Sequence, residues 1–79
     1  MHEKIDYKGR STQQMKDYGL LEDEVREILL SYPSTPDKDV ENLWGCRGPI
    51  RRDTTISVRY TIDGETTVVL RVVVLERLI

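Results

Sequence analysis

Two arginines carry the clearest chemistry in this sequence. Polar and apolar residues alternate over Thr54–Ile62, which predicts a half-buried strand with Arg59 on its less apolar side. The next predicted strand, Thr66–Leu75, carries Arg71. A planar guanidinium group suits phosphate and carboxylate, so we take both arginines as candidate binding residues. The alternative is that they only keep one face of a sheet in contact with water.

The same arginines are also the candidate catalytic residues. A metal-independent endoribonuclease needs cations beside the scissile phosphate and an acid–base pair for the two oxygens that exchange protons. Arg59 and Arg71, with Arg51 or Arg52, meet the first requirement. Only Tyr60 and Tyr32 are candidates for the second requirement, and the pattern directs both inward, so the catalytic residues stay unknown.

Other reactive side chains have simpler explanations. His2 lies at the chain terminus, where residues are usually mobile. No motif places a histidine beside Cys46, so we expect it to be a buried filler, and Trp44 to be a core anchor. The acidic run Glu22–Glu24 opens a predicted helix, where carboxylates favour the helix dipole. We therefore expect no metal site and no cofactor.

Composition limits the class of protein. The chain has 79 residues, enough for one domain, residues 1–79, because single cores usually occupy about 50–200 residues. Its net charge of −2 gives no general attraction to nucleic acid or anionic membrane, and we find no DNA-specific signal. Residues 1–46 hold six basic and ten acidic residues, whereas residues 47–79 hold six arginines and four acids. One cysteine, no run of about 18 apolar residues and a polar N-terminus predict a cytoplasmic protein without a membrane span.

The first half of the chain predicts two helices. Ser11 and Gln14 have capping-box spacing for a helix that runs to Tyr18, and Gly19 suits the left-handed residue that ends it. From Leu21 to Tyr32, apolar residues recur with helical period until Pro33 stops the pattern.

The second half predicts a sheet. Short strands are expected around Ile5 and Tyr7 and over Val40–Arg47, beside the C-terminal hairpin. The fold class is therefore α+β, with two N-terminal helices packed on one face of an antiparallel three- or four-stranded sheet.

Turn chemistry predicts the register of the hairpin. A three-residue loop over residues 62–64 pairs Val58 with Val68 and so brings apolar residues together, whereas a two-residue Asp63-Gly64 loop splits them between faces. The preferred register puts Arg59, Arg71, Val69 and Val73 on one face. With Arg51 and Arg52, these are the predicted partner-binding residues.

The final predicted strand is apolar on both sides. Val72–Leu75 continues through Glu76 and Arg77 to Leu78 and Ile79, more apolar surface than two helices can cover. We therefore expect a homodimer or a complex with a protein partner.

Two segments resemble a known group of proteins. The sequence MKDYGLLEDEVREILLSYP, residues 15–33, and the sequence ISVRYTIDGETTVVLRVV, residues 56–73, are similar to small bacterial domains related to the RelE/ParE and BrnT toxins. Such domains often carry a histidine at or before the first helix, where this chain has Arg10, Ser11 and Tyr18. The resemblance implies the fold and a toxin–antitoxin or mobile-element context, with an antitoxin-like partner that masks the sheet.

Three functions remain open. The first is an interaction module of the RelE/BrnT type, a toxin or degenerate toxin, that binds a protein or RNA through its sheet face. The second is an endoribonuclease, acting with or without the ribosome, that uses the strand arginines. The third is a non-catalytic phage or regulatory inhibitor. The net charge disfavours free RNA as the main partner, because each phosphate contact needs a cation.

Overall fold

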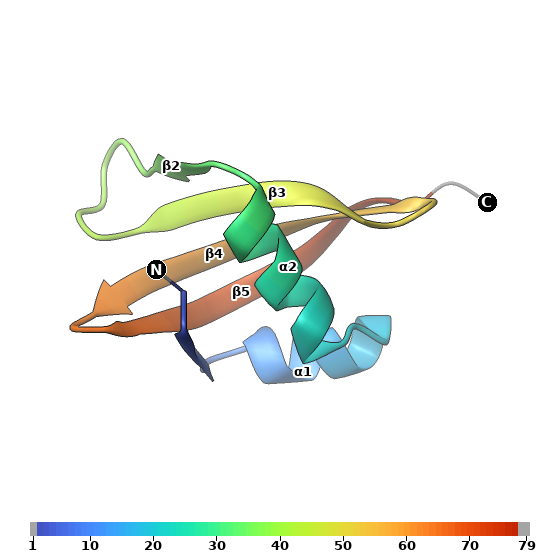
Figure 1. Cartoon of the computed structure of the whole chain (residues 1–79), viewed down its shortest axis with the longest axis horizontal. Coiled ribbons are helices and arrows are strands. Elements are labelled where there is room, and N and C mark those ends of the chain that lie inside the picture. The colour runs from blue at the N-terminus through green and yellow to red at the C-terminus, as the bar shows by residue number, and fades with distance from the viewer. Residues whose placement is uncertain (1, 78–79) are drawn as a thin grey trace.

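The computed structural model describes residues 2–77, and the side chains of residues 2–75. It forms one layer of helices on one face of a sheet (Figure 1). In chain order the elements are β1 (Lys4–Tyr7), α1 (Ser11–Tyr18), α2 (Glu22–Ser31), β2 (Ser34–Pro36), β3 (Trp44–Arg51), β4 (Thr54–Asp63) and β5 (Thr66–Arg77). The α+β class is confirmed.

The sheet has five strands in the order β1-β5-β4-β3-β2. β1 pairs parallel to β5 and every other pair is antiparallel, so the predicted purely antiparallel sheet of three or four strands is wrong. The two helices carry the chain from β1 at one edge of the sheet to β2 at the other, and β5 then pairs beside β1. Residues 34–37, which follow Pro33 and include Pro36, have the sequence of a loop, but residues 34–36 form β2. A proline is tolerated on this outermost strand, where no N–H is needed on the free side.

A glycine ends α1 as predicted. Gly19 has a φ of 67°, the N–H of Gly19 donates to the carbonyl oxygen of Lys16, and the N–H of Leu20 donates to that of Met15. These two bonds make a Schellman motif, and Leu20 and Met15 are both buried. The chain therefore turns sharply from α1 into α2.

The predicted capping box at Ser11 is wrong. Arg10 is the N-cap, and the hydroxyl of Ser11 instead donates to the carbonyl oxygens of Lys8 and Val69, at 2.6 and 3.1 Å. The amide oxygen of Gln14 accepts from the N–H of Val72 at 2.9 Å. Both side chains therefore hold α1 against β5 rather than closing its own first turn.

The core lies between the helices and the sheet. α1 packs on β5, and α2 packs on β3 and β4. Cys46 is buried as predicted, whereas Trp44 is only partly buried and packs against the core. The buried apolar residues are Met15, Leu20, Val25, Ile28, Leu29, Cys46, Ile56, Val58, Tyr60, Val68, Val69 and Val72.

The hairpin register differs from both predicted alternatives. Its loop is Gly64-Glu65, and Asp63 pairs with Thr66. Of the two loop residues only Gly64 has a positive φ, 61°, as in a type II′ turn. The predicted three-residue loop over residues 62–64 is therefore wrong, because a two-residue turn starting at Gly64 shifts every later pair.

Irregular pairing changes the register along β5. Leu70 has no partner, since Arg59 pairs with Arg71 while Tyr60 pairs with Val69. Such a bulge puts two successive residues of one strand on the same side of the sheet. Val69 therefore faces the helices, and Leu70 and Arg71 both face away.

Candidate partner-binding face

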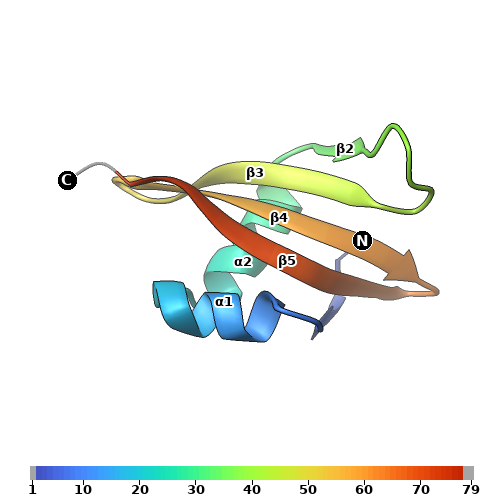
Figure 2. The same cartoon turned by 180° about the vertical axis from the view of Figure 1, so that it is seen from behind.

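Within residues 2–77, one side of the sheet carries no helix. Figure 2 shows this side of β3, β4 and β5 without any element in front of it. Arg59 pairs with Arg71, and Ser57 lies between Arg47 on β3 and Val73 on β5. We call this side the open face and define it by these five residues. Alternation along β4, predicted from the sequence, is what places Arg59 there.

The arginines of the open face are poorly neutralised. Among residues 2–75, no carboxylate lies within ion-pair distance of Arg47 or Arg71. One guanidinium nitrogen of Arg59 lies 3.4 Å from a carboxylate oxygen of Asp37, in the loop after β2. Like charges directly opposite in a ladder destabilise the pair, so the Arg59 and Arg71 pair favours a bound anion.

Two depressions hollow the open face. The larger, about 620 Å³, has Gly45 in its lining and is bordered by Arg47, Arg59 and the Asp37 loop. The smaller, about 350 Å³, is lined by Ser57, Arg59, Arg71, Val73 and Leu75. We call them the Gly45 depression and the Val73 depression. Because Arg59 and Ser57 line both, the two depressions adjoin each other on this face.

The apolar residues predicted for this face divide between two places. Val73 is half-buried in the Val73 depression, and Leu75 beside it is 50% exposed. Val69 is 0% exposed within the core, so the prediction that it shares a face with Arg59 is wrong. Val73 and Leu75 give the open face an apolar border at the end of β5, and Leu70 adds exposed apolar surface beside Arg71.

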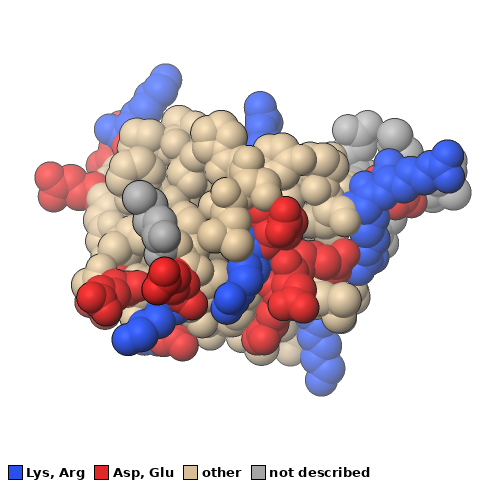
Figure 3. Space-filling view, in the orientation of Figure 1, with Lys and Arg blue, Asp and Glu red and all other residues tan. Residues whose placement is uncertain are grey.

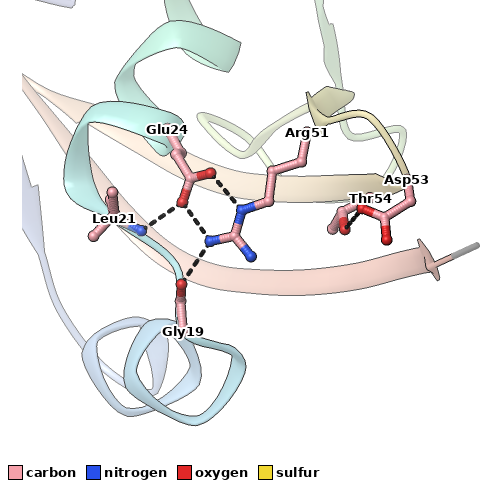
Figure 4. Close-up of polar contacts among 6 residues, drawn as sticks. All are labelled: Gly19, Leu21, Glu24, Arg51, Asp53 and Thr54. Carbon is pink, nitrogen blue, oxygen red and sulfur yellow. Dashed lines mark hydrogen bonds and ion pairs between the residues drawn. The ribbon is translucent and has the colours of Figure 1, made fainter. Parts of the chain in front are cut away.

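Arg51 lies outside this face and fixes the helix corner. In Figure 4 its guanidinium group meets the carboxylate of Glu24, with nitrogen–oxygen distances of 2.8 and 2.9 Å. It also donates to the carbonyl oxygen of Gly19 at 2.7 Å, while Glu24 accepts from the N–H of Leu21 at 2.9 Å. These contacts lower the pKa of Glu24, the Arg51 hydrogen bonds contributing most. Arg51 therefore joins the end of β3 to the corner between α1 and α2.

We expect Arg51→Lys to lower the melting temperature by about 3–6 °C, because an ammonium group cannot make the paired contact with Glu24. The pKa of Glu24 is lowered from its ordinary 4.5, so this stabilisation is complete above that pH and is lost as the pH falls through the lowered pKa. Thermal melts of both proteins at neutral and acid pH should converge in acid. Arg52→Lys, at an exposed position in the next turn, is the control. An equal loss in both variants would contradict the assignment.

The possible acid–base groups lie away from the open face. His2 is buried rather than mobile: its Nδ1 lies 2.7 Å from the hydroxyl of Thr67, and its ring meets Tyr60 edge-on. Burial, and next the N-terminal charge, lower the pKa of His2. The hydroxyl of Tyr60 donates to that of Ser34 at 2.6 Å. Neither group stands beside Arg59 and Arg71.

Cys46 and Tyr32 also have structural roles. The thiol of Cys46 donates to the carbonyl oxygens of Ile28 and Tyr32, and burial raises its pKa. The ring of Tyr32 lies over Gly48, where an added Cβ would stand 2.8 Å from it. A buried, protonated thiol is a poor nucleophile.

Charge separates the two sides of the molecule. Figure 3 views the helix side, where acidic side chains gather over the helices. Glu22, Asp23 and Glu24 form the first turn of α2.

Within residues 2–77 no cluster of histidine, cysteine or acidic side chains is arranged to hold a metal. No described helix is long and apolar enough to cross a membrane.

Asp37 and Gly45 were not among the predicted site residues. The spacing of Asp37 to Asp39 after Pro36 is typical of an Asx turn, and that signal could have located the loop. Nothing in the sequence relates Gly45 to Arg59, because their pairing is a property of the sheet.

Comparisons with protein-family models, with curated proteins and with solved structures found no match to this chain. The resemblance to RelE/ParE and BrnT domains therefore stays a prediction.

Proposed function

We propose that this chain is an interaction module of the toxin–antitoxin or mobile-element type that binds an acidic segment of a protein partner across its open face. The observation that supports it most is the pairing of Arg59 with Arg71 on an uncovered sheet face. A carboxylate between the two guanidinium groups offsets their repulsion and makes charge-assisted hydrogen bonds. Val73 and Leu75 supply an apolar border for a neighbouring side chain.

Charge favours such a partner over a second copy. A two-fold axis through the open face would place Arg47, Arg59 and Arg71 against the same three residues. Like charges across an interface cost several kcal/mol, on the order of the binding energy they would oppose. Of the two expected assemblies, a homodimer or a complex with a protein partner, we therefore favour the complex, with an acidic, antitoxin-like cytoplasmic protein.

RNA fits this face less well. The net charge is −2, and Asp37 stands beside one of the three arginines. The apolar border at Val73 suits a side chain better than a phosphate. A ribonuclease would in addition need an acid–base pair. Of the two candidate tyrosines, Tyr60 is buried in the core with its hydroxyl bonded to Ser34, and the ring of Tyr32 packs over Gly48.

A peptide of alternating glutamate and leucine, labelled with a fluorophore, tests the proposal by anisotropy titration. We expect Arg59→Ala/Arg71→Ala to weaken peptide binding at least about tenfold, because each substitution removes a charged hydrogen bond to a peptide carboxylate. Arg10→Ala/Arg26→Ala removes the same charge from exposed helix positions and should leave binding nearly unchanged. Circular dichroism checks that all proteins are folded.

Two results would contradict the proposal. One is an equal loss of peptide binding in both double variants. The other is binding of a single-stranded oligoribonucleotide in preference to the peptide. Growth arrest with transcript cleavage that depends on Arg59 and Arg71 would establish the ribonuclease instead.

A further inference from the structure

Arg59 stands between the two depressions of the open face. It lines both the Gly45 depression and the Val73 depression, and it faces Gly45 on one neighbouring strand and Arg71 on the other. Gly45 has no side chain to separate Arg59 from the loop after β2. A Cβ added there would meet only the carbonyl oxygen of Thr35, at 3.9 Å. The guanidinium group can therefore be reached from either depression.

The loop holds Asp37 in place without help from Arg59. One carboxylate oxygen of Asp37 accepts from the N–H groups of Asp39 and Val40, at 2.9 and 3.0 Å. The backbone N–H of Asp37 donates to the carbonyl oxygen of Leu43 at 2.8 Å. The two N–H groups, and after them the Arg59 guanidinium group, lower the pKa of Asp37. The carboxylate is therefore ionised and fixed.

The far end of the same loop is tied to β4. The side-chain amide of Asn42 donates to the carbonyl oxygen of Ile62 at 2.8 Å, and the N–H of Ile62 donates to the amide oxygen of Asn42 at 3.1 Å. The loop is therefore anchored at both ends, and the position of Asp37 does not depend on a ligand.

The second oxygen of Asp37 makes a weak contact with Arg59. The nitrogen–oxygen distance is 3.4 Å, and the Arg59 side chain is 54% exposed. The paired contacts of Arg51, at 2.8 and 2.9 Å, show what a close arginine–carboxylate pair looks like in the same molecule. Exposed pairs with long contacts hold their arginine only loosely.

We propose that Asp37 is an internal stand-in for the partner: a carboxylate of the bound acidic segment takes its place at Arg59, whose exposed guanidinium group moves away from the fixed loop, and bridges Arg59 and Arg71. This inference rests on the proposed function, because it concerns the same face and the same partner. Asp37 then acts as a built-in competitor that weakens binding and selects partners whose carboxylate reaches both arginines. A partner whose carboxylate reaches Arg59 but not Arg71 makes only the contact that Asp37 already makes, and so binds no more favourably than Asp37 does.

Asp37→Asn tests this step with the fluorescent glutamate–leucine peptide. The amide oxygen still accepts the two backbone N–H bonds, so the loop keeps its turn, but the charge beside Arg59 is gone. We expect the affinity for the peptide to rise about threefold to fivefold, because the exposed ion pair that competes with the peptide for Arg59 is lost. Asp39→Asn makes the same change in charge on the same loop, at an exposed side chain, and should leave the affinity near that of the wild type.

The outcomes separate the two proposals. An equal rise in both variants would mean that only net charge matters and would overturn the role of Asp37. An unchanged affinity in Asp37→Asn, with the loss in Arg59→Ala/Arg71→Ala intact, would overturn the displacement and leave the proposed function standing. If wild type and Asp37→Asn bind the peptide no better than the double arginine variant, the proposed function fails and the displacement fails with it.

Discussion

We expect Gly48→Ala to destabilise the protein by about 2 kcal/mol, because a methyl group at this position has no room. The added Cβ would lie 2.8 to 2.9 Å from three ring atoms of Tyr32, well inside van der Waals contact. Tyr32 is a partly buried residue that packs against the core, so moving its ring aside would disturb that packing. Urea unfolding at neutral pH measures the change.

Gly45→Ala is the matched control for this prediction. Gly45 lies on the same strand, but a Cβ there meets only an oxygen at 3.9 Å, so we expect a change within about 0.5 kcal/mol. A similar loss of stability in both variants would show that glycine flexibility in β3, rather than contact with Tyr32, decides the effect. Neither residue has a positive φ, so backbone strain does not enter the comparison.

The largest loss is expected for Ile28→Ala. Ile28 is 0% exposed and lies on the inner side of α2, against the sheet. Truncation removes buried methyl and methylene groups and leaves a cavity, at a cost of about 3 kcal/mol. In a domain of this size each kcal/mol lowers the melting temperature by about 4–8 °C, so the variant should melt far below the wild type.

Leu30→Ala tests whether this loss comes from burial. Leu30 is two residues further along the same helix and is 57% exposed, so we expect a small change in stability. Equal losses at Leu30 and Ile28 would contradict the packing of α2 described above. Thermal melts followed by circular dichroism at one protein concentration are sufficient.

The helices could be predicted because their signals are local. Val25, Ile28 and Leu29 recur with helical period, and the same three residues are the buried ones in α2. The end of α1 at Gly19 could be predicted because it requires only a left-handed backbone conformation at that one residue, which glycine adopts easily. The capping box predicted at Ser11 and Gln14 rested on an equally local signal but was wrong, because both side chains bond to β5, more than 50 residues away.

The candidate site could be predicted in part. The period of two along β4 was enough to put Arg59 on the less apolar side. Arg71 reached the same side only because Leu70 forms a bulge, whereas the register of the Gly64-Glu65 turn had already paired Val69 with Tyr60 and so placed it in the core. Arg51 was predicted to bind a partner but contacts Glu24, from a helix that precedes it by more than 20 residues.

By itself, the sequence determined the helices, the alternation of β4, the acidic first half and the arginine-bearing second half. These follow from neighbouring residues, whose spacing along a helix or strand is set by backbone geometry. The tertiary structure decided the parallel place of β1, the register of the hairpin, the partner of Arg51 and the approach of Asp37 to Arg59. Each of these depends on residues far apart in the chain, which meet only after the sheet has formed, so no local spacing encodes them.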